Sequence, residues 1–168
     1  MPEFVGSYIK EPSDFATVTT EADLIQVADD PASPVVPEDT LSWAELVAGE
    51  KAALKAVIDP IIIRKEGIID GYLRAGGYAT PADIVRNPII QDYAARLVWN
   101  DLRYRKKQLS DEEYRTANAD ILKELSQIGS GALVLAAAPS IDEDAPSGLV
   151  HAVKSSPRVF SRETLEEF

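Results

Sequence analysis

Apolar residues recur every three or four positions over three stretches of the chain, which is the spacing of amphipathic helices. The first stretch covers residues 40–75, with apolar positions at Leu41, Leu46, Leu54, Val57, Ile58, Ile61, Ile62, Ile69 and Leu73. The second follows Asn87 and places on one face Ile90, Tyr93, Ala94, Leu97, Val98 and Leu102. The third contains Tyr114, Ala117, Ile121, Leu122, Leu125 and Ile128. The pattern predicts a mainly α fold, a small helical bundle with apolar residues on more faces than its own core needs.

Start and stop signals bound these helices. N-cap signals stand at Thr20 with Asp23, at Asn87 with Pro88, and at Ser110 with Glu113. Glycines that suit a left-handed helix end follow at Gly76-Gly77, Gly129 and Gly131. Pro60 lies inside the first long helix, where it removes a backbone hydrogen bond, so we expect the helix to kink or split near Ala56–Asp59.

Composition divides the rest of the chain. We predict an N-terminal arm at residues 1–18, the helical bundle at 19–131 and a short strand-like segment of small apolar residues at 132–138. Proline, acidic residues, serine and glycine then predict a flexible linker at 139–156, and the last twelve residues, 157–168, form a tail.

The tail mixes apolar side chains with charges of both signs. Its candidate interaction residues are Arg158, Val159, Phe160, Arg162, Leu165 and Phe168. So few apolar side chains cannot offset the entropy of ordering the segment alone. We therefore interpret residues 157–168 as a docking tail that completes its core on another chain.

The net charge of −11 is unevenly distributed. Residues 1–50 hold eleven acids and one base, residues 51–138 hold eleven acids and thirteen bases, and residues 139–168 hold six acids and three bases. Three interpretations of this acidity stay open on charge alone: it keeps the protein soluble, it lets the protein face DNA without holding it, or it matches a basic partner.

Candidate chemistry is sparse. The chain has no cysteine and one histidine, His151, which argues against thiolate or histidine metal sites and against a catalytic triad. Asp111, Glu112 and Glu113 fit a helix start better than carboxylate catalysis. The acids Asp59, Glu66 and Asp70 on one helix fit a solvated face better than a metal site. We expect no cofactor, no metal and no enzymatic activity.

Three further features bear on partners. The basic run Arg103–Lys107 ends a helix, where cations favour the helix dipole, and it is also the candidate for a nucleic-acid-binding module, our alternative function. Trp43 and Trp99 are expected in the core or at a subunit interface. No run of about eighteen apolar residues is present, so we expect no membrane partner.

Several residues resemble, in their order, the Mu-like phage head-tail connector family. They are Leu24-Ile25-Gln26, Ile68–Leu73, the turn Gly77, Tyr78 and Pro81, Pro88 before the Tyr93–Arg103 helix, Glu113-Tyr114, Leu122 with Leu125, Gly129–Leu135 and Arg158–Leu165. The loop Asp29–Asp39 is longer than in many members of that family.

The resemblance implies a structural adaptor, made in the host cytoplasm and located in the virion neck. Such proteins form a ring of roughly twelve copies below the portal, a closed head-to-tail assembly. The implied partners are the portal protein, neighbouring copies of the chain, a downstream stopper or tail-terminator protein, and genomic DNA that passes without sequence recognition. The tail would reach onto the portal or an adjacent subunit.

Overall fold

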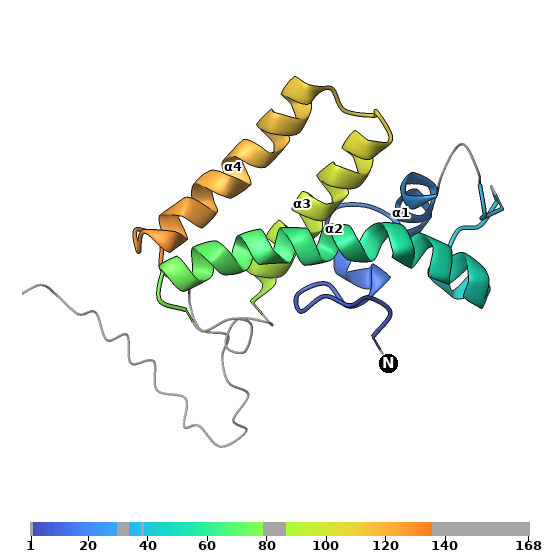
Figure 1. Cartoon of the computed structure of the whole chain (residues 1–168), viewed down its shortest axis with the longest axis horizontal. Helices are drawn as coiled ribbons and strands as arrows, with labels where there is room; N and C mark the ends of the chain where they lie inside the picture. The colour runs from blue at the N-terminus through green and yellow to red at the C-terminus, as the bar shows by residue number, and fades with distance from the viewer. Residues whose placement is uncertain (1, 30–33, 38, 79–86, 136–168) are drawn as a thin grey trace, which may run out of the picture.

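The computed structural model describes residues 2–29, 34–37, 39–78 and 87–135. In these residues the chain forms the helices α1 (Glu21–Ala28), α2 (Ala48–Ala75), α3 (Pro88–Arg105) and α4 (Asp111–Gly129), with short 3-10 helices η1 (Pro12–Phe15) and η2 (Trp43–Glu45). The long helix α2 crosses the pair α3 and α4, and α1 lies beside the first half of α2 (Figure 1). The predicted mainly α fold is confirmed.

The core lies where the apolar faces of α2, α3 and α4 meet. Its most deeply buried side chains include Leu54, Ile58, Ile62, Ile69, Leu73, Ile90 and Leu97. The predicted apolar face of α3 is buried throughout. On α4 the predicted Ala117 is exposed and its neighbour Asn118 is buried instead, because Asn118 lies one turn before Ile121 and Leu122 and has a polar partner on α3.

The predicted helix starts are confirmed by their hydrogen bonds. The Thr20 hydroxyl oxygen accepts from the backbone N–H of Asp23 at 3.1 Å and begins α1. Asn87 Oδ1 accepts from the N–H of Ile89 at 3.0 Å and begins α3. Each cap satisfies a donor that the first helical turn leaves without a partner.

Ser110 and Glu113 cap α4 reciprocally. The Ser110 N–H donates to Glu113 Oε2 at 2.8 Å, and the Glu113 N–H donates to Ser110 Oγ at 3.3 Å. Hydrogen bonds from the Ser110 backbone, and then from its hydroxyl, lower the pKa of Glu113. The acids at 111–113 therefore belong to a helix start, as the sequence predicted.

The end of α2 has the geometry that its two glycines predict. The Tyr78 N–H donates to the Leu73 carbonyl at 3.0 Å, and the Gly77 N–H donates to the Arg74 carbonyl at 3.0 Å. Gly77 has φ +83°, a left-handed conformation that strains residues with a Cβ atom.

The expected start of the first long helix was wrong, and of the expected kink or split at Pro60 the split does not occur. The helix begins at Ala48 rather than near residue 40, so Leu41 precedes it and is 67% exposed. Pro60 does not split it, and α2 is continuous to Ala75. Pro60 is on the exposed side, while Ile58 and Ile62 on either side of it are buried. Packing of the buried face on both sides of the proline outweighs the lost backbone hydrogen bond.

Residues 2–18, predicted as an arm, are largely non-helical but pack onto the helices. Phe4, Tyr8 and Phe15 are buried, and the Phe4 ring meets the edges of Phe15 at 6.2 Å and of Trp43 at 5.2 Å between ring centroids. Of the two expected locations, core or subunit interface, Trp43 lies in the core. Trp99 is partly buried and packs against the same core. The aromatic residues of this segment are spaced irregularly, so they showed no helical period in the sequence. They nevertheless fill the same core as the helices.

The chain after α4 forms no strand over the described residues 132–135, contrary to expectation. The Leu133 N–H instead donates to the Gln127 carbonyl at 3.1 Å, which closes the helix end. Leu135 is buried, and its N–H donates to the Tyr78 hydroxyl at 2.9 Å. The rest of the predicted strand, the linker and the docking tail with its six candidate residues lie outside the described residues.

Candidate interaction site

A cleft opens where the middle of α2 faces the end of α3 and the beginning of α4. It has a volume of about 810 Å³. An apolar wall from α2 includes Val57, Pro60 and Ile61, and the polar side comes from Arg64, Lys65, Asp101, Tyr104, Arg105 and Tyr114. The cleft therefore joins an apolar strip to a charged, aromatic one.

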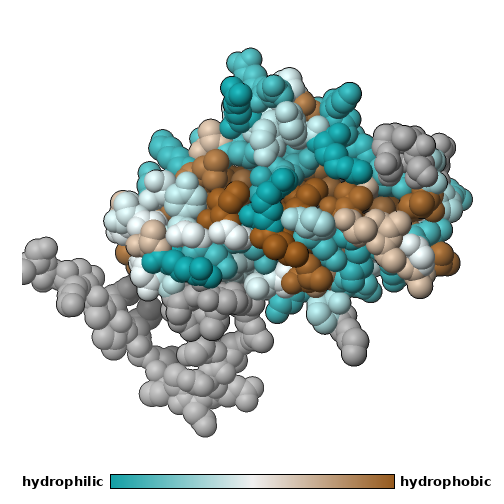
Figure 2. Space-filling view, viewed as in Figure 1, coloured by the Kyte–Doolittle hydropathy of each residue, from teal (hydrophilic) through white to brown (hydrophobic). Residues whose placement is uncertain are grey.

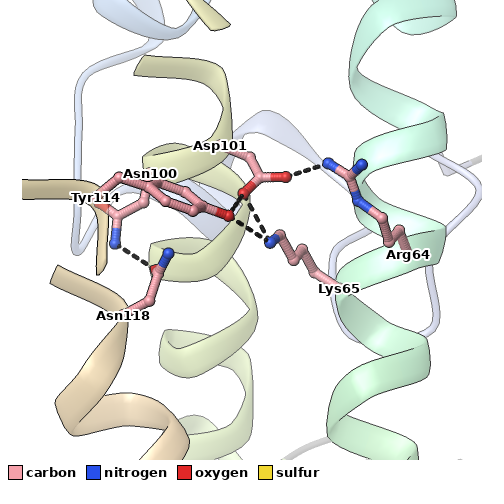
Figure 3. A network of polar contacts seen from close by, with 6 residues as sticks. All are labelled: Arg64, Lys65, Asn100, Asp101, Tyr114 and Asn118. Atoms are coloured by element: carbon pink, nitrogen blue, oxygen red, sulfur yellow. Dashed lines mark hydrogen bonds and ion pairs between the residues drawn. The ribbon is translucent and has the colours of Figure 1, made fainter. Parts of the chain in front are cut away.

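Asp101 is the centre of the polar side (Figure 3). Its carboxylate accepts from the Lys65 ammonium at 2.7 Å and from the Tyr114 hydroxyl through Oδ1, and it pairs with the Arg64 guanidinium through Oδ2. Lys65 Nζ also donates to the Tyr114 hydroxyl oxygen at 3.1 Å. One carboxylate thus joins α2, α3 and α4.

The two charged groups at the centre of this network are buried. The side chains of Asp101 and Lys65 are 6% and 8% exposed, whereas that of Arg64 is 63% exposed. A charge held away from water is stable only while it is paired and hydrogen-bonded. Arg64, in contrast, presents its guanidinium to the cleft opening and keeps donors for another anion.

A second polar pair lies next to Asp101. Asn100 Nδ2 donates to Asn118 Oδ1 at 3.0 Å, and both residues are buried (Figure 3). This pair fixes the register of α3 against α4, because a shift by one residue would leave two buried amides without partners.

The mouth of the cleft is aromatic. The rings of Tyr104 and Tyr114 stack with centroids 4.5 Å apart, and the Tyr104 hydroxyl donates to Asp111 Oδ1 at 2.7 Å. Tyr104 is 41% exposed, so part of this stacked pair faces solvent.

The basic run Arg103–Lys107 is divided by the fold. The Arg105 guanidinium donates to the Ala28 carbonyl at 3.3 Å and lines the cleft, while Lys107 has φ +56° in the turn beyond α3. Arg103 and Lys106 are half-buried. A nucleic-acid-binding module concentrates its basic residues on one face. The run Arg103–Lys107 does not form one continuous basic face.

The three acids of α2 have a function that the sequence did not indicate. Glu66 is buried and accepts backbone N–H groups of Ser7, Tyr8 and Ile9 at 2.6, 2.8 and 2.9 Å. The expected solvated face was wrong here, because the N-terminal segment lies over these acids.

The neighbouring acids continue the same attachment. Asp70 accepts from the Tyr8 hydroxyl at 2.6 Å, and Asp59 accepts from the Val5 N–H at 3.4 Å. Among the described residues, no group of three or more acidic or histidine side chains could hold a metal ion.

A long face of α2 remains exposed. Small or apolar residues recur on it at three- and four-residue spacing: Gly49, Ala52, Ala56, Pro60, Ile63, Gly67 and Gly71. Figure 2 shows hydrophobic residues gathered along the course of α2 across the middle of the molecule. Exposed helix faces usually carry charges, so this apolar face is a candidate contact surface.

The network around Asp101 was not predicted from the sequence. A signal for it existed, since Asp101 follows Leu97 by four residues and Val98 by three, which places an acid on the apolar face of α3. The partners Arg64 and Lys65 could not be identified in the same way, because their distance from Asp101 depends on how α2 crosses α3.

Together, the fold and the cleft define a small all-helical domain with buried ionic contacts and an exposed apolar face on its longest helix. The chain belongs to the family described as "Bacteriophage Mu, Gp36", whose family model matches residues 8–153. It is therefore a bacteriophage protein of a Mu-like phage family. Among curated proteins and among solved structures, no significant match was found. No helix in the described part of the chain is long and apolar enough to cross a membrane.

Proposed function

We propose that the protein is a structural adaptor of a tailed-phage neck, which forms a ring below the portal, extends the DNA channel and joins head to tail. The observation that carries the proposal is the family match over residues 8–153. The role is structural rather than enzymatic and is located at the head-tail interface of the virion.

The exposed face of α2 supports a ring. In a closed head-to-tail ring each copy uses two different surfaces, one toward each neighbour. The stripe from Gly49 to Gly71 supplies one such surface, because small residues let a neighbouring backbone or side chain approach closely.

The charge distribution supports passage of DNA. The chain carries a net charge of −11, and eleven of its acids lie in residues 1–50 against one base. Acidic side chains repel DNA phosphates and shorten the time that DNA stays bound, so an acidic channel wall would let DNA slide. Genomic DNA is then a passing partner without sequence recognition.

The portal protein is the proposed partner of the tail, with a stopper or tail-terminator protein on the opposite side. Phe160, Leu165 and Phe168 would be the anchors, with Arg158, Val159 and Arg162 beside them. Interface anchors of this kind each cost about 2 kcal/mol or more when truncated.

The test is mass measurement of purified neck complexes, together with negative-stain images of the protein with and without a portal ring. We expect roughly twelve copies in a closed ring on the portal. One or two copies per virion would rule out the ring. Binding of the free protein to duplex DNA at physiological salt, with no affinity for the portal ring, would favour the nucleic-acid-binding alternative through residues 103–107.

A further inference from the structure

We propose that the cleft between α2, α3 and α4 binds the acidic end of this same chain, residues 163–168, in the free protein. Neither this surface nor this state of the free protein is required by the neck role. The proposed docking rests on the charge of the cleft, on the chemistry of the chain end and on the length of chain between them.

The cleft is a basic site on an acidic protein. Three cationic side chains line it, those of Arg64, Lys65 and Arg105, against one carboxylate, that of Asp101. Lys65 pairs with Asp101 in the buried interior. Arg64 also pairs with Asp101 and Arg105 donates to the Ala28 carbonyl, but the Arg64 side chain is 63% exposed and Arg105 is also exposed. Each of these two guanidinium groups has five N–H donors, so each keeps donors for a further carboxylate.

The cleft also offers an apolar and aromatic surface. Pro60 is exposed on the α2 wall beside Val57 and Ile61, and the stacked Tyr104 faces it from α3. A ligand that fits carries carboxylates next to a large apolar group, so that one part pairs with arginine and the other covers the wall. Asp111, which Tyr104 holds at the rim, disfavours acids on that side.

The end of the chain has this chemistry. Three acids, Glu163, Glu166 and Glu167, are interspersed with Leu165 and Phe168. Glu167 next to Phe168 combines a carboxylate with an aromatic ring, and such a pair suits an arginine beside a stacked tyrosine.

The chain is long enough to reach the cleft. Leu135 is held by Tyr78 at the end of α4 opposite to Tyr114, and α4 spans 19 residues, or about 28 Å at 1.5 Å per residue. Residues 136–162, which include the predicted flexible linker 139–156, would span about 29 Å on average if they all behave as a flexible chain. A linker whose average length matches the span gives an effective concentration on the order of 1 mM, far above that of a second copy in dilute solution.

Docking of the chain end within its own molecule has a consequence for assembly. The apolar residues of the tail are covered until a partner competes for them. A portal or neighbouring subunit would then displace residues 163–168 from the cleft rather than meet a free tail.

The test uses the full chain with one nitroxide label. The natural sequence has no cysteine, so Ser161→Cys gives a single attachment point next to the proposed ligand. Backbone amide signals are recorded by NMR with the label oxidised and reduced. With an effective concentration on the order of 1 mM and a similar Kd, the segment is bound about half of the time, and we expect about twofold or greater loss of intensity near Arg64 and Tyr104.

Two variants and a dilution series decide the outcome. Arg64→Gln with Arg105→Gln should restore the signals, whereas Arg96→Gln, which changes an arginine paired with Asp92 outside the cleft, should leave the loss unchanged. The loss of signal intensity should be the same after dilution. When labelled protein is mixed with isotope-enriched protein that carries no label, the loss should fall only in proportion to the labelled fraction. Transfer of the effect between molecules, loss centred elsewhere, or no loss would each overturn the proposal.

Discussion

Asp101 lies on the apolar face of α3, and its carboxylate is the counterion of the buried Lys65 ammonium. The two groups are almost fully buried and 2.7 Å apart. Such a pair contributes little compared with an apolar pair, but loss of one member leaves a charge without compensation. Replacement of Asp101 is therefore expected to be strongly destabilising.

We expect Asp101→Asn to lower the free energy of unfolding by about 3 kcal/mol, since the Lys65 ammonium loses its counterion. Arg96→Gln is the matched control: it breaks the Arg96–Asp92 ion pair, whose arginine is 54% exposed, and should cost less than about 1 kcal/mol. Urea denaturation of the variants measures both. Equal costs would mean that the buried network adds nothing beyond a surface ion pair.

Tyr93 makes stability sensitive to alkaline pH. Burial, followed by the hydrogen bond from its hydroxyl to Glu124, raises the pKa of Tyr93 from 10.0 to about 12. A pKa raised in the folded state gives stability that is present below the unfolded value and is lost as pH rises through the folded one. The free energy of unfolding should therefore fall between pH 10 and 12.

Tyr93→Phe should flatten this part of the pH profile, because the variant has no phenol to titrate. Glu124→Gln should flatten it in part, since it removes a carboxylate that favours the protonated phenol. Thermal melts at intervals from pH 8 to pH 12 provide the measurement. An unchanged slope in both variants would assign the alkaline loss to other groups, such as Tyr8, whose pKa burial and Asp70 also raise.

At the scale of elements, Glu66 joins the N-terminal segment to α2. Replacing it with Gln keeps one acceptor but turns an amide donor toward N–H groups at residues 7–9. We expect Glu66→Gln to cost about 2 kcal/mol, as for loss of hydrogen bonds to a charged acceptor. Asp59→Asn, which affects one longer contact at 3.4 Å, is the control and should cost less.

The readout for this variant is amide hydrogen exchange at residues 7–9 together with the thermal melt. Faster exchange at these amides with α3 unchanged would show that the N-terminal segment loosens by itself. Faster exchange throughout the domain, together with a lower melting temperature, would instead mean that the segment is part of one cooperative core.

Pro60 interrupts the hydrogen bonding of α2 on its exposed side, and the helix continues nonetheless. Pro60→Ala should raise the free energy of unfolding by about 1–3 kcal/mol, because alanine restores the backbone donor and removes the steric clash. Ala56→Gly, at the preceding exposed turn, should change stability by about 1 kcal/mol in the opposite direction. A Pro60→Ala variant that is less stable would mean that the proline geometry is needed for packing onto α3.

At the scale of the whole molecule, residues 157–168 should be dispensable for folding and required for assembly. The described helices already bury a shared core without them. Deletion of residues 157–168 should lower the circular dichroism melt only slightly, because a segment bound about half of the time stabilises the fold by about 0.4 kcal/mol. The same deletion should abolish the joining of DNA-filled heads to tails. A normal yield of joined particles would contradict the docking role, and a collapsed melt would place these residues in the core.

The sequence by itself determined the local structure. The three cap signals, the glycines after α2 and the apolar face of α3 are confirmed because they depend on contacts within a few residues. Hydrophobic period also predicted a mainly α fold, since each helix must bury one face. The family resemblance followed residues in their order along the chain, and the bacteriophage family is confirmed over residues 8–153.

Only the tertiary structure decided which polar groups meet. Glu66 looked solvated because its partners lie almost sixty residues earlier, and the network of Asp101 needs three helices to cross at one point. The continuity of α2 through Pro60 was likewise set by packing on its buried face. Contacts between distant segments depend on the angle and register of the helices, and a helical period records only which face is apolar, not what that face will touch.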